Sequence, residues 1–161
     1  MSAEPLEAEE RAEHLAGGIY GTIVVAGLLA ATGPDESPEV FETAVWVVAT
    51  VLVFWLAHSY ALHMGRRAVG IPGNLRLSLT RNWPLVQSCF LPLLVMFVAD
   101  ALGEDDENAI LIAGWVCVLQ LGVWGLIIGR REHTSWHRVV LTTAGCAGLG
   151  ALMIVLKIII H

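Results

Sequence analysis

Long apolar stretches alternate with short charged segments along the whole chain. Five apolar runs stand out, at residues 15–32, 40–64, 85–102, 109–129 and 139–160. The hydrocarbon core of a bilayer is about 30 Å thick and is crossed by about 20 helical residues. Each run therefore predicts one transmembrane helix. We expect an all-α membrane bundle over residues 15–160, preceded by an acidic cytoplasmic tail over residues 1–14.

The charges between the runs predict how the bundle is oriented. Residues 32–39 and 103–108 carry several carboxylates and no Lys or Arg, whereas residues 65–82 and 129–138 hold seven arginines. Basic loops are retained on the cytoplasmic side of the membrane. The amino terminus is then cytoplasmic and the carboxy terminus lies outside.

Part of the first basic loop has the spacing of a short amphipathic helix. Leu75, Leu79 and Trp83 recur every four residues, which places them on one helix face, and Arg76 lies off that face. We expect an interfacial helix over residues 75–83, with its apolar side in lipid; a plain loop is the alternative. The arginines expected to contact anionic lipids are Arg66, Arg67, Arg76 and Arg81.

A proline lies at the middle of the third apolar run. Pro92 removes a backbone donor from the helix and predicts a kink there. Because lipid offers no hydrogen bonds, the carbonyl that loses its donor has to be satisfied by a neighbouring helix.

Small residues predict where the helices pack, since close approach of backbones drives association in lipid. The helix-packing positions expected from their spacing are Gly17, Gly21, Gly114, Gly122, Gly125 and Gly148. The spacing does not distinguish contacts within one chain from contacts in a homo-oligomer.

Composition narrows the classes of function. The chain has 161 residues, of which 56% are hydrophobic and 15% charged, with a net charge of −6. This is too apolar for a typical soluble domain, and it lacks the basic face that nucleic-acid binding needs. The three cysteines are dispersed, and no zinc, nucleotide-binding or nucleophile motif is present. We expect no enzyme, metal or cofactor.

Polar side chains within the apolar runs are the candidate functional residues, because they are costly in lipid. The candidates for a pathway or an intramembrane polar site are Glu42, His58, Tyr60, Gln87, Asp100 and Gln120. We expect His58 to face other helices and to hydrogen-bond across the bundle, with Gln87 as its partner. For Gln120, structural hydrogen bonding between helices is the main expectation and contact with a substrate is the alternative.

Two segments resemble a family of uncharacterised bacterial small integral membrane proteins. They are FWLAHSYA at residues 54–61 and IYGTI at residues 19–23. The resemblance implies a bacterial cytoplasmic membrane and carries no activity. Two functions stay open on the sequence: an oligomeric ion or proton channel or small transporter, and a non-catalytic accessory, scaffold or sensor protein.

Overall fold

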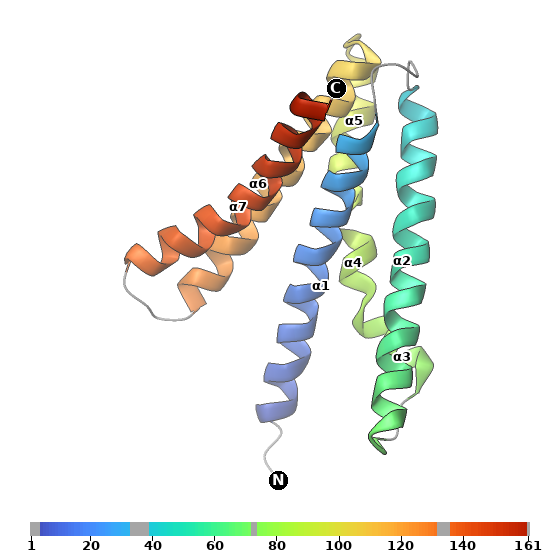
Figure 1. Cartoon of the computed structure of the whole chain (residues 1–161), viewed down its shortest axis with the longest axis vertical. Coiled ribbons are helices and arrows are strands. Elements are labelled where there is room, and N and C mark those ends of the chain that lie inside the picture. The colour runs from blue at the N-terminus through green and yellow to red at the C-terminus, as the bar shows by residue number, and fades with distance from the viewer. Residues whose placement is uncertain (1–3, 33–38, 72–73, 132–135, 161) are drawn as a thin grey trace.

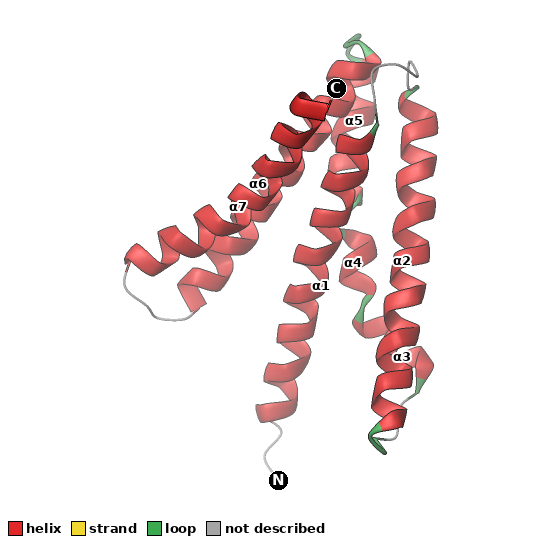
Figure 2. Ribbon diagram, in the orientation of Figure 1, coloured by secondary structure: helices red, strands yellow, loops and turns green. Residues whose placement is uncertain are grey.

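The protein is a bundle of helices. The computed structural model describes residues 4–32, 39–71, 74–131 and 136–160, and every regular element in these ranges is a helix (Figures 1 and 2). The helices are α1 Glu4–Ala31, α2 Val40–Ala68, α3 Leu75–Arg81, α4 Trp83–Gln87, α5 Phe90–Ala101, α6 Asp106–Arg131 and α7 Trp136–Ile160. The long helices run between the two ends of an elongated molecule.

Four helical stretches are long and apolar enough to cross a membrane. They are Ala12–Ala31, Val40–Ala68, Leu75–Ala101 and Asp106–Arg130, and the third combines α3, α4 and α5. They overlap the first four predicted spans, but the third begins ten residues earlier than predicted, at Leu75, and includes the segment expected to be an interfacial helix. The described apolar stretch of α7, Val139–Leu152, is shorter than these four.

An apolar core fills the part of the bundle that is near the acidic loops. Val25 and Leu29 of α1, Val47 of α2, Met96 of α5 and Ile110 of α6 are all at most 2% exposed. These residues belong to one buried cluster. Close packing of this kind leaves little room for water, so the core closes the bundle on its acidic side.

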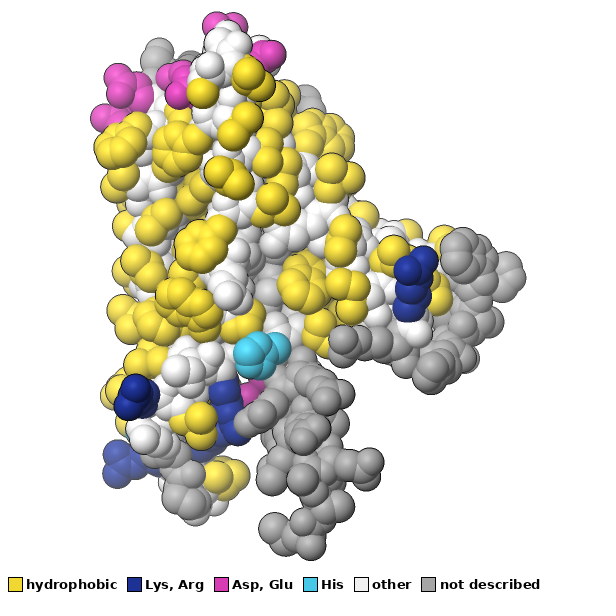
Figure 3. Space-filling view, turned by 180° about the vertical axis from the view of Figure 1, so that it is seen from behind, with side chains coloured by type: hydrophobic (Ala, Val, Ile, Leu, Met, Phe, Trp, Pro, Cys, Tyr) yellow, Lys and Arg dark blue, Asp and Glu magenta, His cyan; other side chains and the backbone are white. Residues whose placement is uncertain are grey.

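The charged side chains gather at opposite ends of the bundle. Carboxylates lie at the end formed by the loop between α5 and α6, and arginines lie around the other end of α2 and α3 (Figure 3). Between them the described surface on the face shown is largely apolar. Trp46, for example, is 61% exposed and Leu119 is 69% exposed. An apolar belt between two charged ends is the surface expected of a protein that crosses a bilayer.

The third span is interrupted at two places. Ser88 and Cys89 form a turn between α4 and α5, and Asn82 separates α3 from α4. The predicted span over residues 85–102 is thus interrupted near Pro92, where the sequence predicts a kink, and it remains part of one apolar stretch, Leu75–Ala101. The break at Ser88 lies four residues before Pro92, because a proline ring clashes with the carbonyl four residues earlier.

Glycines of α1 permit close contact with α4 inside the same chain. A β-carbon on Gly21 would lie 2.5 Å from the carbonyl oxygen of Leu85, and one on Gly17 would lie 3.7 Å from the Leu85 nitrogen. Gly18, which was not among the expected packing positions, lies under the ring of Trp124 of α6. The other expected packing glycines differ. Within the described part of the chain, β-carbons on Gly114, Gly122 and Gly148 would meet nothing within 4 Å, whereas Gly125 is buried.

Candidate functional site

Side chains from neighbouring helices hydrogen-bond to the backbone near both breaks of the third span. Pro92 has no N–H to offer to the carbonyl of Ser88, and the Gln120 Nε2 of α6 donates to that oxygen at 3.4 Å. Near the other break, the Trp55 Nε1 of α2 donates to the carbonyl oxygen of Leu79 at 3.1 Å. A buried carbonyl without a partner costs about 1–3 kcal/mol. These bonds stabilise the breaks, as expected for irregular backbone within a membrane bundle.

Two side chains of the turn between α4 and α5 also donate hydrogen bonds to nearby backbone carbonyls. The Ser88 hydroxyl donates to the Leu85 carbonyl at 2.7 Å, and the Cys89 thiol donates to the Val86 carbonyl at 3.0 Å. Both side chains are buried. The two residues thus replace backbone donors that a continuous helix would supply, which makes the break a stable part of the fold.

A polar pocket lies beside this break, between α1, α4 and α6. Its volume is about 220 Å³, and it is lined by His14, Leu15, Pro84, Gln87, Ser88, Gln120 and Trp124. Two polar atoms of these residues are buried and have no hydrogen-bond partner in the described part of the chain, the Gln120 Oε1 and the Trp124 Nε1. The first is an acceptor and the second a donor. A bound polar molecule that both donates and accepts can satisfy both.

The lining indicates what kind of molecule fits the pocket. Among the described residues that line it there is no carboxylate or arginine, and His14 is the one ionisable side chain. At a volume share of about 30 Å³ per water, the pocket has room for about seven waters. It therefore suits a small uncharged solute with both donor and acceptor groups, or a cluster of water.

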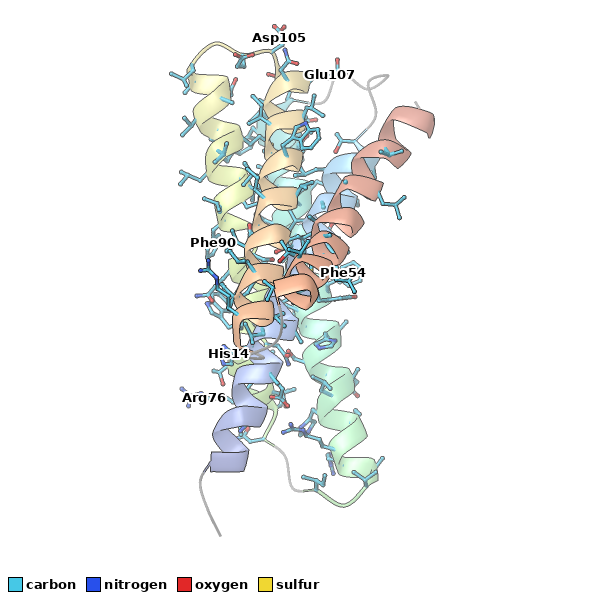
Figure 4. The ribbon with its side chains drawn as sticks, turned by 90° about the vertical axis from the view of Figure 1, so that its left-hand side faces the viewer. His14, Phe54, Arg76, Phe90, Asp105 and Glu107 are labelled. Atoms are coloured by element: carbon cyan, nitrogen blue, oxygen red, sulfur yellow. The ribbon has the colours of Figure 1, made fainter. Side chains whose placement is uncertain are left out.

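The pocket lies toward the arginine-rich side of the apolar core. α6 and α7 diverge from α1 in the direction of the basic end (Figure 1). His14, on α1, lies between the levels of Phe90 and Arg76 (Figure 4). On the other side of the pocket, the fully buried Cys117 of α6 belongs to the apolar core.

A polar network holds α3 and α4 against α2 and α1. The Glu13 carboxylate of α1 contacts Arg66 of α2 at 2.8 Å and Arg81 of α3 at 3.7 Å. The buried amide of Asn82 donates to the Ser59 hydroxyl of α2 at 3.3 Å and to the Ser78 carbonyl at 2.8 Å. These contacts hold α3 and the junction of α3 and α4 against the long helices α1 and α2.

The structure brings two of the expected site residues together and separates the others. Gln87 and Gln120 line the same pocket. His58 is exposed and stacks on Tyr20 of α1, with ring centroids 5.8 Å apart. The expected hydrogen bond between His58 and Gln87 is therefore wrong. Glu42, Tyr60 and Asp100 are exposed and do not line the pocket.

Several site residues were not anticipated from the sequence. His14, Ser88 and Trp124 line the pocket. Trp55 binds Leu79 of α3, and Ser59 binds Asn82 between α3 and α4. Two signals were available: Ser88 lies four residues before Pro92, and Trp55 and Ser59 are one helical turn apart. His14 carries no such signal, because it joins the pocket only through the packing of α1.

No protein-family model, curated protein or solved structure matches this chain. The fold and its four candidate spans are those of a multi-pass helical membrane protein. Any more specific function has to be argued from the pocket and the broken span.

Proposed function

We propose that this protein is a small membrane transporter that binds an uncharged polar solute in the pocket between α1, α4 and α6. The observation that carries the proposal is a broken span beside a pocket with a buried acceptor and a buried donor, the Gln120 Oε1 and the Trp124 Nε1. Neither atom has a hydrogen-bond partner among the residues that the structure describes. Transporters commonly place their binding sites at discontinuous helices, where freed backbone and polar side chains meet.

In the proposed arrangement α7 is a fifth span. Its 25 residues extend for about 37 Å at 1.5 Å per residue, which is enough to cross the membrane. The arginine-rich end is cytoplasmic, in a bacterial cytoplasmic membrane, with its arginines at the level of anionic headgroups. The pocket then opens toward the cytoplasm.

The packed apolar core on the acidic, outer side of the bundle is more consistent with a transporter than with a channel. A channel needs a continuous polar path, whereas Val25, Met96 and Ile110 form a packed apolar layer on the acidic side of the pocket. Release to the outside would require this layer to part, which is the alternating-access behaviour of transporters. The first alternative is a channel, with its pathway between the subunits of a homo-oligomer near Glu42 or Tyr60. The second alternative is an accessory protein, which would transport no solute or ion.

The orientation predicts an asymmetric labelling pattern. Two single cysteines are introduced into a variant without Cys89, Cys117 and Cys146, at Asp105 in the acidic loop and at the 72%-exposed Val69 after α2. In intact cells a membrane-impermeant maleimide should label Asp105→Cys and leave Val69→Cys unlabelled until lysis. The reverse pattern would contradict the orientation.

The transport proposal predicts uptake that depends on Gln120. Proteoliposomes are tested with glycerol and urea as uncharged probes and with K⁺ and H⁺ as ionic ones. We expect uptake of at least one uncharged probe, and we expect Gln120→Leu to slow it by about tenfold, the size of one lost buried hydrogen bond. The matched control is Leu119→Ala, which changes an adjacent side chain that is 69% exposed.

A second variant separates transport from folding, because Gln120 also supports the break at Ser88. Trp124→Phe keeps an aromatic ring beside Gly18 and removes the donor. It should slow uptake by a similar factor at nearly unchanged melting temperature. Flux of K⁺ or H⁺ alone would favour the channel alternative, and no flux of any probe would favour the accessory protein.

A further inference from the structure

A second hollow, separate from the polar pocket, lies between α2 and the segment formed by α3 and α4. Its volume is about 350 Å³, and it is lined by Trp55, Arg76, Leu79, Thr80 and Trp83. Three of these five side chains are apolar or aromatic. We call it the tryptophan groove.

The walls of the tryptophan groove are held in place by direct contacts. The Trp55 indole donates to the Leu79 carbonyl at 3.1 Å. Trp55 and Trp83 meet edge to face, with ring centroids 5.6 Å apart. The Thr80 hydroxyl donates to backbone carbonyls of its own helix. Because the Trp55 and Thr80 donors are already used, these side chains and Leu79 offer dispersion contacts, which suit a hydrocarbon chain.

One arginine at the edge of the groove is available to an anion. Arg66 and Arg81 contact Glu13. Arg76 is exposed and forms no ion pair within the described part of the chain. A guanidinium presents a planar fork of donors that matches two oxygens of a phosphate. Among the described residues, the groove thus combines an apolar floor with an arginine that forms no ion pair.

We propose that the tryptophan groove binds one molecule of an anionic phospholipid, with its phosphate on Arg76 and an acyl chain along Trp55, Leu79 and Trp83. The position of Trp55 along the membrane normal agrees with this placement. Trp55 precedes Arg66 by 11 residues on α2, so it lies about 16 Å further from the basic end, in the acyl-chain region. Basic pockets on the cytoplasmic side of membrane helices bind acidic headgroups in this manner.

The experiment is native mass spectrometry of the intact protein in detergent. The protein is titrated with phosphatidylglycerol and with phosphatidylcholine that carry the same acyl chains. We expect one tightly bound phosphatidylglycerol, and we expect Arg76→Gln to weaken its binding by about fivefold, toward that of phosphatidylcholine. Arg76→Lys keeps the charge without the fork and should give an intermediate affinity.

The matched control is Arg67→Gln, which removes an exposed arginine that does not line the groove. It should leave the affinity unchanged. Millimolar inorganic phosphate should not displace the lipid, because phosphate alone gains nothing from the apolar floor. Equal losses in Arg76→Gln and Arg67→Gln would overturn the proposal, as would equal binding of the two lipids or a second protein chain in place of lipid.

Discussion

Replacing Gly21 with alanine is expected to lower the free energy of unfolding by about 3 kcal/mol, the upper part of the range for overpacking a well-packed core. The added β-carbon would lie 2.5 Å from the Leu85 carbonyl oxygen and 2.9 Å from the Leu85 Cα, and it would also meet the Ser88 hydroxyl. Backbone atoms cannot rotate away as a flexible side chain can. α1 and α4 would therefore have to separate beside the broken span.

The measurement is unfolding in mixed micelles of a mild detergent and SDS, followed by circular dichroism. Gly27→Ala is the matched control, since it lies on the same helix and its β-carbon would meet nothing within 4 Å. Alanine also favours helix by up to about 1 kcal/mol over glycine, so the control should be neutral or slightly stabilising. Similar midpoints for the two variants would refute the close contact between α1 and α4.

Asn82→Ala is expected to cost about 2 kcal/mol. Asn82 is 5% exposed, and its amide donates to the Ser59 hydroxyl and to the Ser78 carbonyl. The substitution removes both bonds and leaves buried groups unsatisfied, which costs about 1–3 kcal/mol. Because these bonds hold the junction of α3 and α4 against α2, the tryptophan groove should also loosen.

A double-mutant cycle isolates the contact between the two helices. Ser59→Ala and Asn82→Ala are measured singly and together, and we expect a coupling of about 0.6 kcal/mol or more, as for polar contacts in membrane bundles. Asn108→Ala, at an exposed position near the start of α6, controls for the loss of an amide. Additive effects of the two single variants would show that Asn82 does not bind α2.

The first four spans were predictable because hydropathy depends on consecutive residues and not on their neighbours in space. The apolar runs at residues 40–64 and 109–129 fall inside α2 and α6. The helices extend beyond the runs, as α2 does to Ala68, because backbone hydrogen bonding continues through charged residues that no longer contact lipid.

The broken span was predictable only in part. Pro92 predicts an interruption of the helix near Ser88, because a proline acts on the carbonyl four residues earlier in its own chain segment. The separation of α3 from α4 at Asn82 depends also on contacts with Trp55 and Ser59 of another helix. The one-turn spacing of Trp55 and Ser59 places them on one helix face, but it does not say which helix that face contacts.

The candidate site was also predictable from the sequence only in part. Sequence alone placed Gln87 and Gln120 among the costly polar residues of the spans. It also favoured His58, which the structure places on an exposed face against Tyr20. α2 is apolar around most of its circumference, so its periodicity does not state which side faces inward.

The sequence by itself determined that the chain is helical, where its first four apolar helices lie and which loops are acidic or basic. These properties follow from runs of neighbouring residues. Only the tertiary structure decided that His14, Ser88 and Gln120 meet around one pocket and that Trp55 and Trp83 form another. The rotation of each helix about its axis is set by contacts between helices, such as Gly21 on Leu85, because lipid favours no one face of a uniformly apolar helix.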